Sequence, residues 1–126
     1  MIVLDTHTWW WAISEPDRLS VRAAETIGDT PADQRCVAAI SLWEFVMMVS
    51  RGRIHLTISP KTWLQHAVHT VGTRVLPLVE DIAVESCYLP GDFHSDPADR
   101  LIVATARIHR AILVTKDQKI RDYPHV

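Results

Sequence analysis

Short apolar runs alternate with longer amphipathic segments along this chain. Four runs rich in valine, isoleucine and leucine are short enough to be strands, and they cover residues 2–5, 36–40, 74–78 and 111–115. Continuous apolar runs of this length are typical of strands that are buried on both faces of a sheet. The pattern therefore predicts a mainly parallel central sheet.

The segments between these runs have the periodicity of helices. Apolar residues recur three and four positions apart, as in Leu42, Phe45, Val46 and Val49. The predicted helices cover residues 6–13, 21–27, 41–52, 61–71 and 79–89, with a sixth that starts at Asp96-Pro97. Strands that alternate with helices predict an α/β fold, in which helices cover both faces of a parallel sheet.

Composition and charge narrow the class of protein. The chain has 126 residues without a repeat or a Gly/Ser linker, so we expect a single domain over residues 1–126. No stretch approaches the roughly 18 apolar residues of a membrane span. Cys36 and Cys87 are far apart and form no C-x-x-C pair, which suits a reducing cytoplasm. The net charge of −2 argues mildly against a nucleic-acid partner, because the protein has no overall positive field to hold one.

Acidic residues from four separate segments fall near one predicted edge of the sheet. Asp5 ends the first strand, and Glu44 lies in the first turn of the helix after the second strand. Asp99 lies in the first turn of the helix that precedes the last strand, and Asp117 follows that strand. Ligands of parallel sheets bind beyond the carboxyl ends of the strands. This edge is therefore the candidate site.

Each acid also has a purely structural interpretation. Ser41 and Glu44 have the spacing of a capping box, and Asp96, Pro97 and Asp99 fit a helix start with Asp96 as the N-cap. Taken alone, these two motifs favour capping. For Asp117, which can cap a short final helix, capping and function are evenly balanced.

Asp5 favours function over structure. It follows three apolar residues and precedes a tryptophan-rich segment, so its charge is expected to lie near the core. A buried acid without a matching charge or metal is costly.

The combination of acids points to a hard divalent cation. Carboxylates that converge within a few ångströms repel each other unless a cation lies among them. No cysteine or histidine has zinc-like spacing, so the expected ion is Mg²⁺ or Mn²⁺. Such ions activate water and hold a phosphodiester for attack, and they neutralise phosphates locally. A nuclease therefore needs no overall positive charge.

Four sequence pieces resemble one family. They are IVLDTHTWWWA (2–12), AAISLWEF (38–45), DPADRLIVATA (96–106) and LVTKD (113–117). Together and in this order, they look like a PIN-domain protein, specifically a VapC-type toxin ribonuclease of a type II toxin–antitoxin pair. The resemblance implies a PIN-like three-layer sandwich and an endoribonuclease that depends on Mg²⁺ or Mn²⁺. It also implies an RNA substrate and a homodimer that a small antitoxin, VapB-type or similar, holds inactive.

The resemblance also assigns residues. The acidic positions of the family map onto Asp5, Glu44, Asp99 and Asp117 as metal ligands and catalytic residues, whereas Asp96 becomes the helix cap. Asp96 remains able to assist a second ion or to orient Arg100.

Three further residues are assigned supporting roles. Thr6 and Thr115 match small hydroxyl residues beside the first and fourth acids of the family. Arg100 is expected to pair with a neighbouring carboxylate or a phosphate, or to form an ordinary surface salt bridge.

Three other functions compete with a nuclease. A phosphatase of the haloacid dehalogenase type needs a second acid two residues after the first, but this position is His7. A receiver-like domain would carry its acceptor acid on a middle strand, and a non-catalytic binding module would use the acids only as caps.

Other notable residues are predicted to be structural. The five tryptophans suit the core or a dimer interface better than base stacking. Surface charge is favoured over phosphate contact for the basic residues at element ends, which are Arg51, Arg53, Lys116, Lys119 and Arg121. His94 is close in sequence to the candidate site and able to assist it.

Overall fold

A parallel sheet of four strands forms the centre of the computed structural model, which describes residues 1–126. The strands are β1 (Ile2–Leu4), β2 (Arg35–Ala38), β3 (Arg74–Leu76) and β4 (Ile112–Val114), in the order β3-β2-β1-β4. All three neighbouring pairs are parallel. The predicted sheet is confirmed, although each strand is shorter than its apolar run.

Helices connect the strands at nearly every predicted position. They are α1 (Thr6–Ser14), α2 (Val21–Gly28), α3 (Ile40–Ser50), α4 (Pro60–Gln65), α5 (Glu80–Cys87), α6 (Pro97–Ile108) and α7 (Gln118–Arg121). Short 3₁₀ turns η1 (Pro16–Arg18) and η2 (Ala32–Gln34) adjoin α2, and a π-helical turn η3 (His66–Thr70) continues α4. None of these helices is long and apolar enough to cross a membrane.

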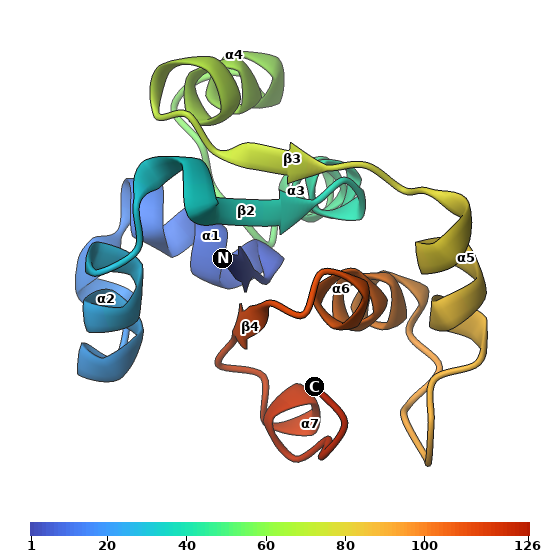
Figure 1. Ribbon diagram of the computed structural model, residues 1–126. Coiled ribbons are helices and arrows are strands. Elements are labelled where there is room, and N and C mark those ends of the chain that lie inside the picture. Colours follow the sequence, from blue (N-terminus) through green and yellow to red (C-terminus); the bar gives the residue numbers. More distant parts are fainter.

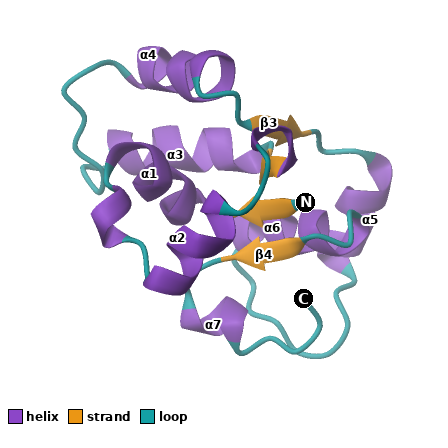
Figure 2. Ribbon diagram, turned by 60° about the vertical axis from the view of Figure 1, so that its left-hand side comes forward, coloured by secondary structure: helices purple, strands orange, loops and turns teal.

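The sheet separates two layers of helices (Figures 1 and 2). Alternate residues of a strand face opposite ways. Accordingly, Leu4 and Val37 pack into a core shared with α1, α3 and α4, whereas Val3 and Cys36 pack against Ala106 of α6. Helix α5 lies along α6 on this second side (Figure 1). The three-layer α/β sandwich is confirmed.

An aromatic cluster fixes α1, α3 and α4 to each other. The rings of Phe45 and Trp63 are stacked at 4.1 Å, and Trp9 meets Trp63 edge-on at 5.0 Å. Such pairs stabilise a core beyond their burial alone. The core role predicted for the tryptophans is confirmed for Trp9, Trp10, Trp11 and Trp63, but Trp43 is 58% exposed.

Helix α3 differs from its prediction at its N-terminus. It begins at Ile40, directly after β2, and its N-cap Ala39 offers no side-chain hydrogen bond. Ser41 therefore lies inside the helix and is fully buried, so the predicted capping box is wrong. The buried face runs through Ser41, Phe45 and Met48, and Val46 is exposed.

The strand order places the ends of β1 and β4 next to each other. From β1 the chain proceeds to β2 and β3 on one side and returns to β4 on the other side. The backbone N–H of Asp5 donates to the carbonyl of Val114 at 3.1 Å, which ties the two carboxyl ends together. Parallel sheets bind their ligands at such a reversal of strand order.

Candidate active site

Asp5 lies at the carboxyl end of β1 and is 7% exposed. Its Oδ1 accepts from the backbone N–H of Thr8 at 2.9 Å, so Asp5 caps α1. Its Oδ2 accepts a hydrogen bond from the hydroxyl of Thr115, just after β4. Both oxygens of this buried carboxylate therefore have a hydrogen-bond partner, and their directions are fixed by two separate segments.

Glu44 faces the same region from the first turns of α3. Thr6 Oγ1 lies 2.5 Å from Glu44 Oε1 and 3.0 Å from Ser41 Oγ. Ser41 and Glu44 lie on one side of α3 because they are three residues apart. Burial raises the pKa of Glu44, and the hydrogen bond from Thr6 partly offsets this effect.

The N-terminus of α6 brings two further acids to this place. Asp96 is the N-cap, because its Oδ1 accepts from the backbone N–H of Asp99 at 3.1 Å. One carboxylate oxygen each of Glu44, Asp96 and Asp99 lies within 4.8 Å of the others. The capping role of Asp96 is confirmed, and the same residue also joins the acidic cluster.

The protonation of Asp99 responds to all the other acids of the site. Its pKa is raised to about 7, first by burial and then by the negative charges of Asp96, Glu44, Asp117 and Asp5. All four charges act on one carboxyl group. The acids therefore lie close together, around the start of α6 and the ends of β1 and β4. A divalent cation would relieve the repulsion that they share.

Asp117 completes the group from the turn after β4. Its Oδ1 accepts from the backbone N–H of Lys119 at 2.9 Å, and its own N–H donates to Thr115 Oγ1 at 3.0 Å. Asp117 therefore caps α7 and also contributes charge at Asp99. The two interpretations of this residue are compatible.

Arg100 does not face a carboxylate. Its Nε donates to the carbonyl of Ser86 at 2.8 Å, and its Nη1 donates to those of Phe93 and His94 at 3.0 and 3.3 Å. The expected ion pair with a neighbouring carboxylate is therefore wrong. A guanidinium has donors on several sides, so Arg100 joins the end of α5 to the loop before α6 and thereby positions that loop.

His94 is closer to the acids than the sequence indicated. Its Nε2 lies 3.2 Å from Asp99 Oδ2, within the range of an ion pair but outside hydrogen-bond geometry. Its position depends on the loop that Arg100 holds, and nothing in the local sequence specifies this orientation.

The donor set suits a hard divalent cation. Glu44, Asp96 and Asp99 offer only carboxylate oxygens, and Mg²⁺ or Mn²⁺ prefers such ligands. The raised pKa values of Glu44 and Asp99 indicate that the site is electrostatically unfavourable when both acids are charged and no cation is bound. The residues therefore fit a divalent metal.

Comparison with known proteins decides the family. The chain matches the PIN domain over residues 2–126. It belongs to the PIN domain family. This membership disfavours the haloacid dehalogenase and receiver alternatives.

Known relatives match this PIN domain over nearly their whole length. Ribonuclease VapC22 of Mycobacterium tuberculosis is 40% identical over 124 residues, which cover 98% of this chain and 92% of the relative. A toxin–antitoxin complex from Klebsiella pneumoniae contains a chain with a TM-score of 0.69 and 19% identity, covering 100% of this PIN domain and 95% of that chain. Mycobacterium tuberculosis VapC20, described as a toxin that cleaves the sarcin-ricin loop, has a TM-score of 0.62 and 17% identity, with coverage of 100% and 98%. The two structures show the shared fold.

Proposed function

We propose that this PIN domain is the toxin of a type II toxin–antitoxin pair and acts as a divalent-metal-dependent endoribonuclease. The observation that carries the proposal is the convergence of acids from β1, α3, α6 and the end of β4 around Asp99. The 40% identity to a protein named Ribonuclease VapC22, over nearly the whole chain, supports RNA as the substrate. The likeness to a chain of a toxin–antitoxin complex agrees with an antitoxin as partner.

Four acids carry the reaction in this proposal. Asp5, Glu44, Asp99 and Asp117 bind metal and form the catalytic centre, and hydrogen bonds to threonine hydroxyls fix two of them. Thr115 orients Asp5, and Thr6 orients Glu44. Asp96 sets the start of α6 and adds a third carboxylate beside Glu44 and Asp99.

Mg²⁺ or Mn²⁺ is the proposed cofactor. The ion would supply a site that activates water and stabilises charge on the phosphodiester. The chain itself contributes fixed carboxylate oxygens, because Thr6 and Thr115 hold Glu44 and Asp5 by hydrogen bonds. Arg100 holds the loop that leads to Asp96, and so sets the position of the α6 acids.

A homodimer is the proposed state of the protein, as the resemblance implies. Helix α3 supports it, since Trp43 is 58% and Val46 is 36% exposed on the helix that also carries Glu44. Exposed apolar groups of this kind favour an interface. We also propose that the chain forms a single domain over residues 1–126 and works in the cytoplasm.

The test is RNA cleavage by the purified protein. Wild type is expected to cut single-stranded RNA with Mg²⁺ or Mn²⁺ and to be inactive in EDTA. Asp5→Asn and Asp99→Asn are expected to lose at least about 100-fold in rate, because each removes a charged ligand. Asp33→Asn, an exposed acid in η2, is the matched control and should cleave like wild type. Cleavage by both site variants at the wild-type rate would contradict the proposal. It would also be contradicted if the wild-type protein binds RNA but does not cut it.

A further inference from the structure

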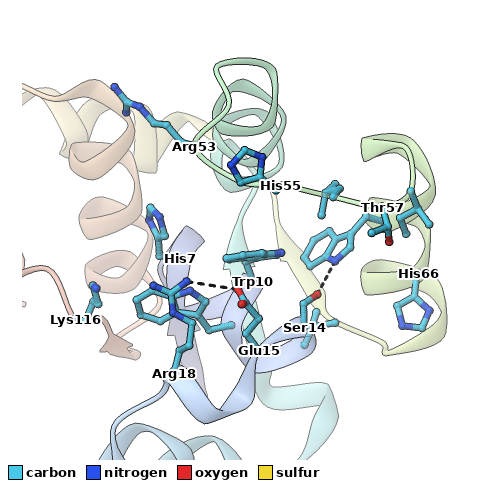
Figure 3. Close-up of a pocket in the computed structure, with 15 residues that line it drawn as sticks. His7, Trp10, Ser14, Glu15, Arg18, Arg53, His55, Thr57, His66 and Lys116 are labelled. Carbon is cyan, nitrogen blue, oxygen red and sulfur yellow. Dashed lines mark hydrogen bonds and ion pairs between the residues drawn. The ribbon is translucent and has the colours of Figure 1, made fainter.

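A groove of about 720 Å³ opens beside the acidic centre, and the proposed mechanism does not use it. One wall is formed by α1, from His7 to Ser14, and by Arg18 of η1. The facing wall comes from residues 53–58 and from α4, and Lys116 lies at one end (Figure 3). This volume lies within the roughly 300–1,000 Å³ typical of ligand sites.

The rim of the groove is basic although the chain as a whole carries a net charge of −2. Arg18, Arg53 and Lys116 contribute three cations, and the only carboxylate among the lining residues is Glu15. Glu15 lies 3.6 Å from Arg18, whereas Arg53 and Lys116 form no ion pair within the chain. The local charge therefore favours an anionic ligand.

The floor of the groove is aromatic. Trp10, Trp11 and Trp63 line it and are nearly buried. Lys116 Nζ lies 4.3 Å from the centre of the Trp11 ring, which orients this cation at the groove. The cations at the rim, and not the buried indole N–H groups of Trp10 and Trp11, are therefore what the groove offers to a ligand.

One end of the groove lies next to the acidic centre, because its lining residues His7 and Lys116 are close in the chain to Asp5 and Asp117. Lys116 lies between Thr115, which bonds to Asp5, and Asp117. His7 follows Asp5 and Thr6 at the start of α1. Figure 3 shows His7 and Lys116 at one end of the groove and Thr57 and His66 at the other. A polymer that enters the acidic centre can thus extend along α1.

We propose that this groove binds the single-stranded RNA segment next to the scissile phosphate, with Arg53 and Lys116 as phosphate-binding residues. The inference rests on the proposed ribonuclease function and assigns its substrate path. A groove with a basic rim can track the phosphate backbone of a single strand, while the buried tryptophans form its rigid floor. An acidic peptide would satisfy the cations too. RNA is favoured because, in the proposed function, its own linkages react at the neighbouring acidic centre.

The affinity for RNA, measured under conditions that prevent cleavage, tests whether the groove binds RNA. The double variant Arg53→Gln/Lys116→Gln is compared with Arg51→Gln/Lys119→Gln, which removes two exposed cations outside the groove and matches the change in net charge. The probe is a fluorescein-labelled single-stranded RNA of mixed sequence, measured by anisotropy in EDTA over a salt series. All four positions are exposed, so circular dichroism should show unchanged folding.

The groove variant is expected to bind RNA about tenfold more weakly, since each lost phosphate contact costs roughly threefold. Its slope of log affinity against log salt should fall by about 1.4, roughly 0.7 for each phosphate contact on a single strand, and the control should retain the wild-type affinity and slope. Equal affinities of the two double variants would overturn the inference. If the groove variant loses affinity for an oligoglutamate peptide as strongly as for RNA, the assignment to RNA is overturned.

This binding readout separates the two proposals. A protein that never cuts RNA contradicts the proposed function, yet its loss of RNA affinity in the groove variant would still support the RNA path. A protein that cuts RNA and binds it equally in both double variants contradicts the RNA path alone.

Discussion

The hydroxyl of Thr115 donates to the carboxylate of Asp5, although 110 residues separate the two in the chain. This bond joins the carboxyl ends of β4 and β1, at the point where the strand order reverses. It therefore couples the fold directly to the orientation of a buried acid. Thr115 also accepts from the backbone N–H of Asp117, so one side chain positions two of the proposed ligands.

Removing this hydroxyl should weaken metal binding more than it weakens folding. We expect Thr115→Val to lower Mg²⁺ affinity roughly 10-fold or more, because residues that orient metal ligands typically contribute this much. Magnesium dependence of RNA cleavage measures the effect. Thr70→Val, an exposed threonine of η3, is the control. A Thr115→Val enzyme with the wild-type magnesium requirement would contradict the role assigned to this bond.

The raised pKa of Asp99 predicts a pH dependence of stability in the absence of metal. Its pKa of about 7 exceeds the value of about 3.9 in unfolded chains, so the folded state holds the extra proton between these values. Stability from this group is therefore complete below about pH 4 and declines as the pH rises towards 7.

Asp99→Asn isolates this effect, because the amide stays neutral at every pH. In EDTA, we expect wild type to be less stable than Asp99→Asn at pH 8 and the difference to shrink at pH 5. Urea unfolding at both pH values provides the measurement. The lowered pKa of His7 acts on both proteins alike and cancels in the comparison. A variant that is less stable than wild type at pH 8 would favour a structural role for the Asp99 charge.

Asp96 combines a cap with a place in the acidic cluster, and two substitutions separate these roles. Asparagine also caps helices well and removes a charge that repels Asp99, so Asp96→Asn should not lower the melting temperature in EDTA and should lose part of the response to Mg²⁺. Asp96→Ala removes the cap as well and should cost about 1 kcal/mol of stability. Thermal unfolding with and without Mg²⁺ distinguishes the variants. An unchanged magnesium response in Asp96→Asn would show that Asp96 acts only as a helix cap.

Arg100 is expected to matter for stability through three backbone carbonyls. Its loss leaves the acceptors of Ser86, Phe93 and His94 unpaired, and we expect Arg100→Gln to lower the free energy of unfolding by about 1–3 kcal/mol. Arg100→Lys should not rescue it, because an ammonium cannot reproduce the planar spread of donors. Denaturant unfolding tests this, with Arg22→Gln of α2 as the exposed control. Full stability in Arg100→Gln would show that other contacts hold the loop.

The strands and the acids at their ends could be predicted from the sequence because both follow local rules. Apolar runs locate the strands, and the alternation with helices brings their carboxyl ends to one edge. The residues Asp5, Glu44, Asp99 and Asp117 follow from that geometry and from the family resemblance. Their gathering around Asp99 is what the structure adds.

Interactions that depend on tertiary packing could not be predicted from the sequence. The spacing of Ser41 and Glu44 fits a capping box, but β2 passes directly into α3 and buries Ser41 against Thr6 instead. Arg100 was expected to pair with a charged group, but its Nε donates to the carbonyl of Ser86 at the end of α5. Local patterns specify a helix start, whereas the partner of a long side chain depends on which segments pack around it.

In the proposed function, these acids share one divalent ion. Isothermal titration of metal-free protein with Mg²⁺ measures this binding, with Glu44→Gln and Asp99→Asn as variants and Asp33→Asn as the control. We expect saturable binding and a higher melting temperature for wild type and the control, and the loss of both in each site variant. Equal magnesium binding by wild type and by both site variants would contradict it.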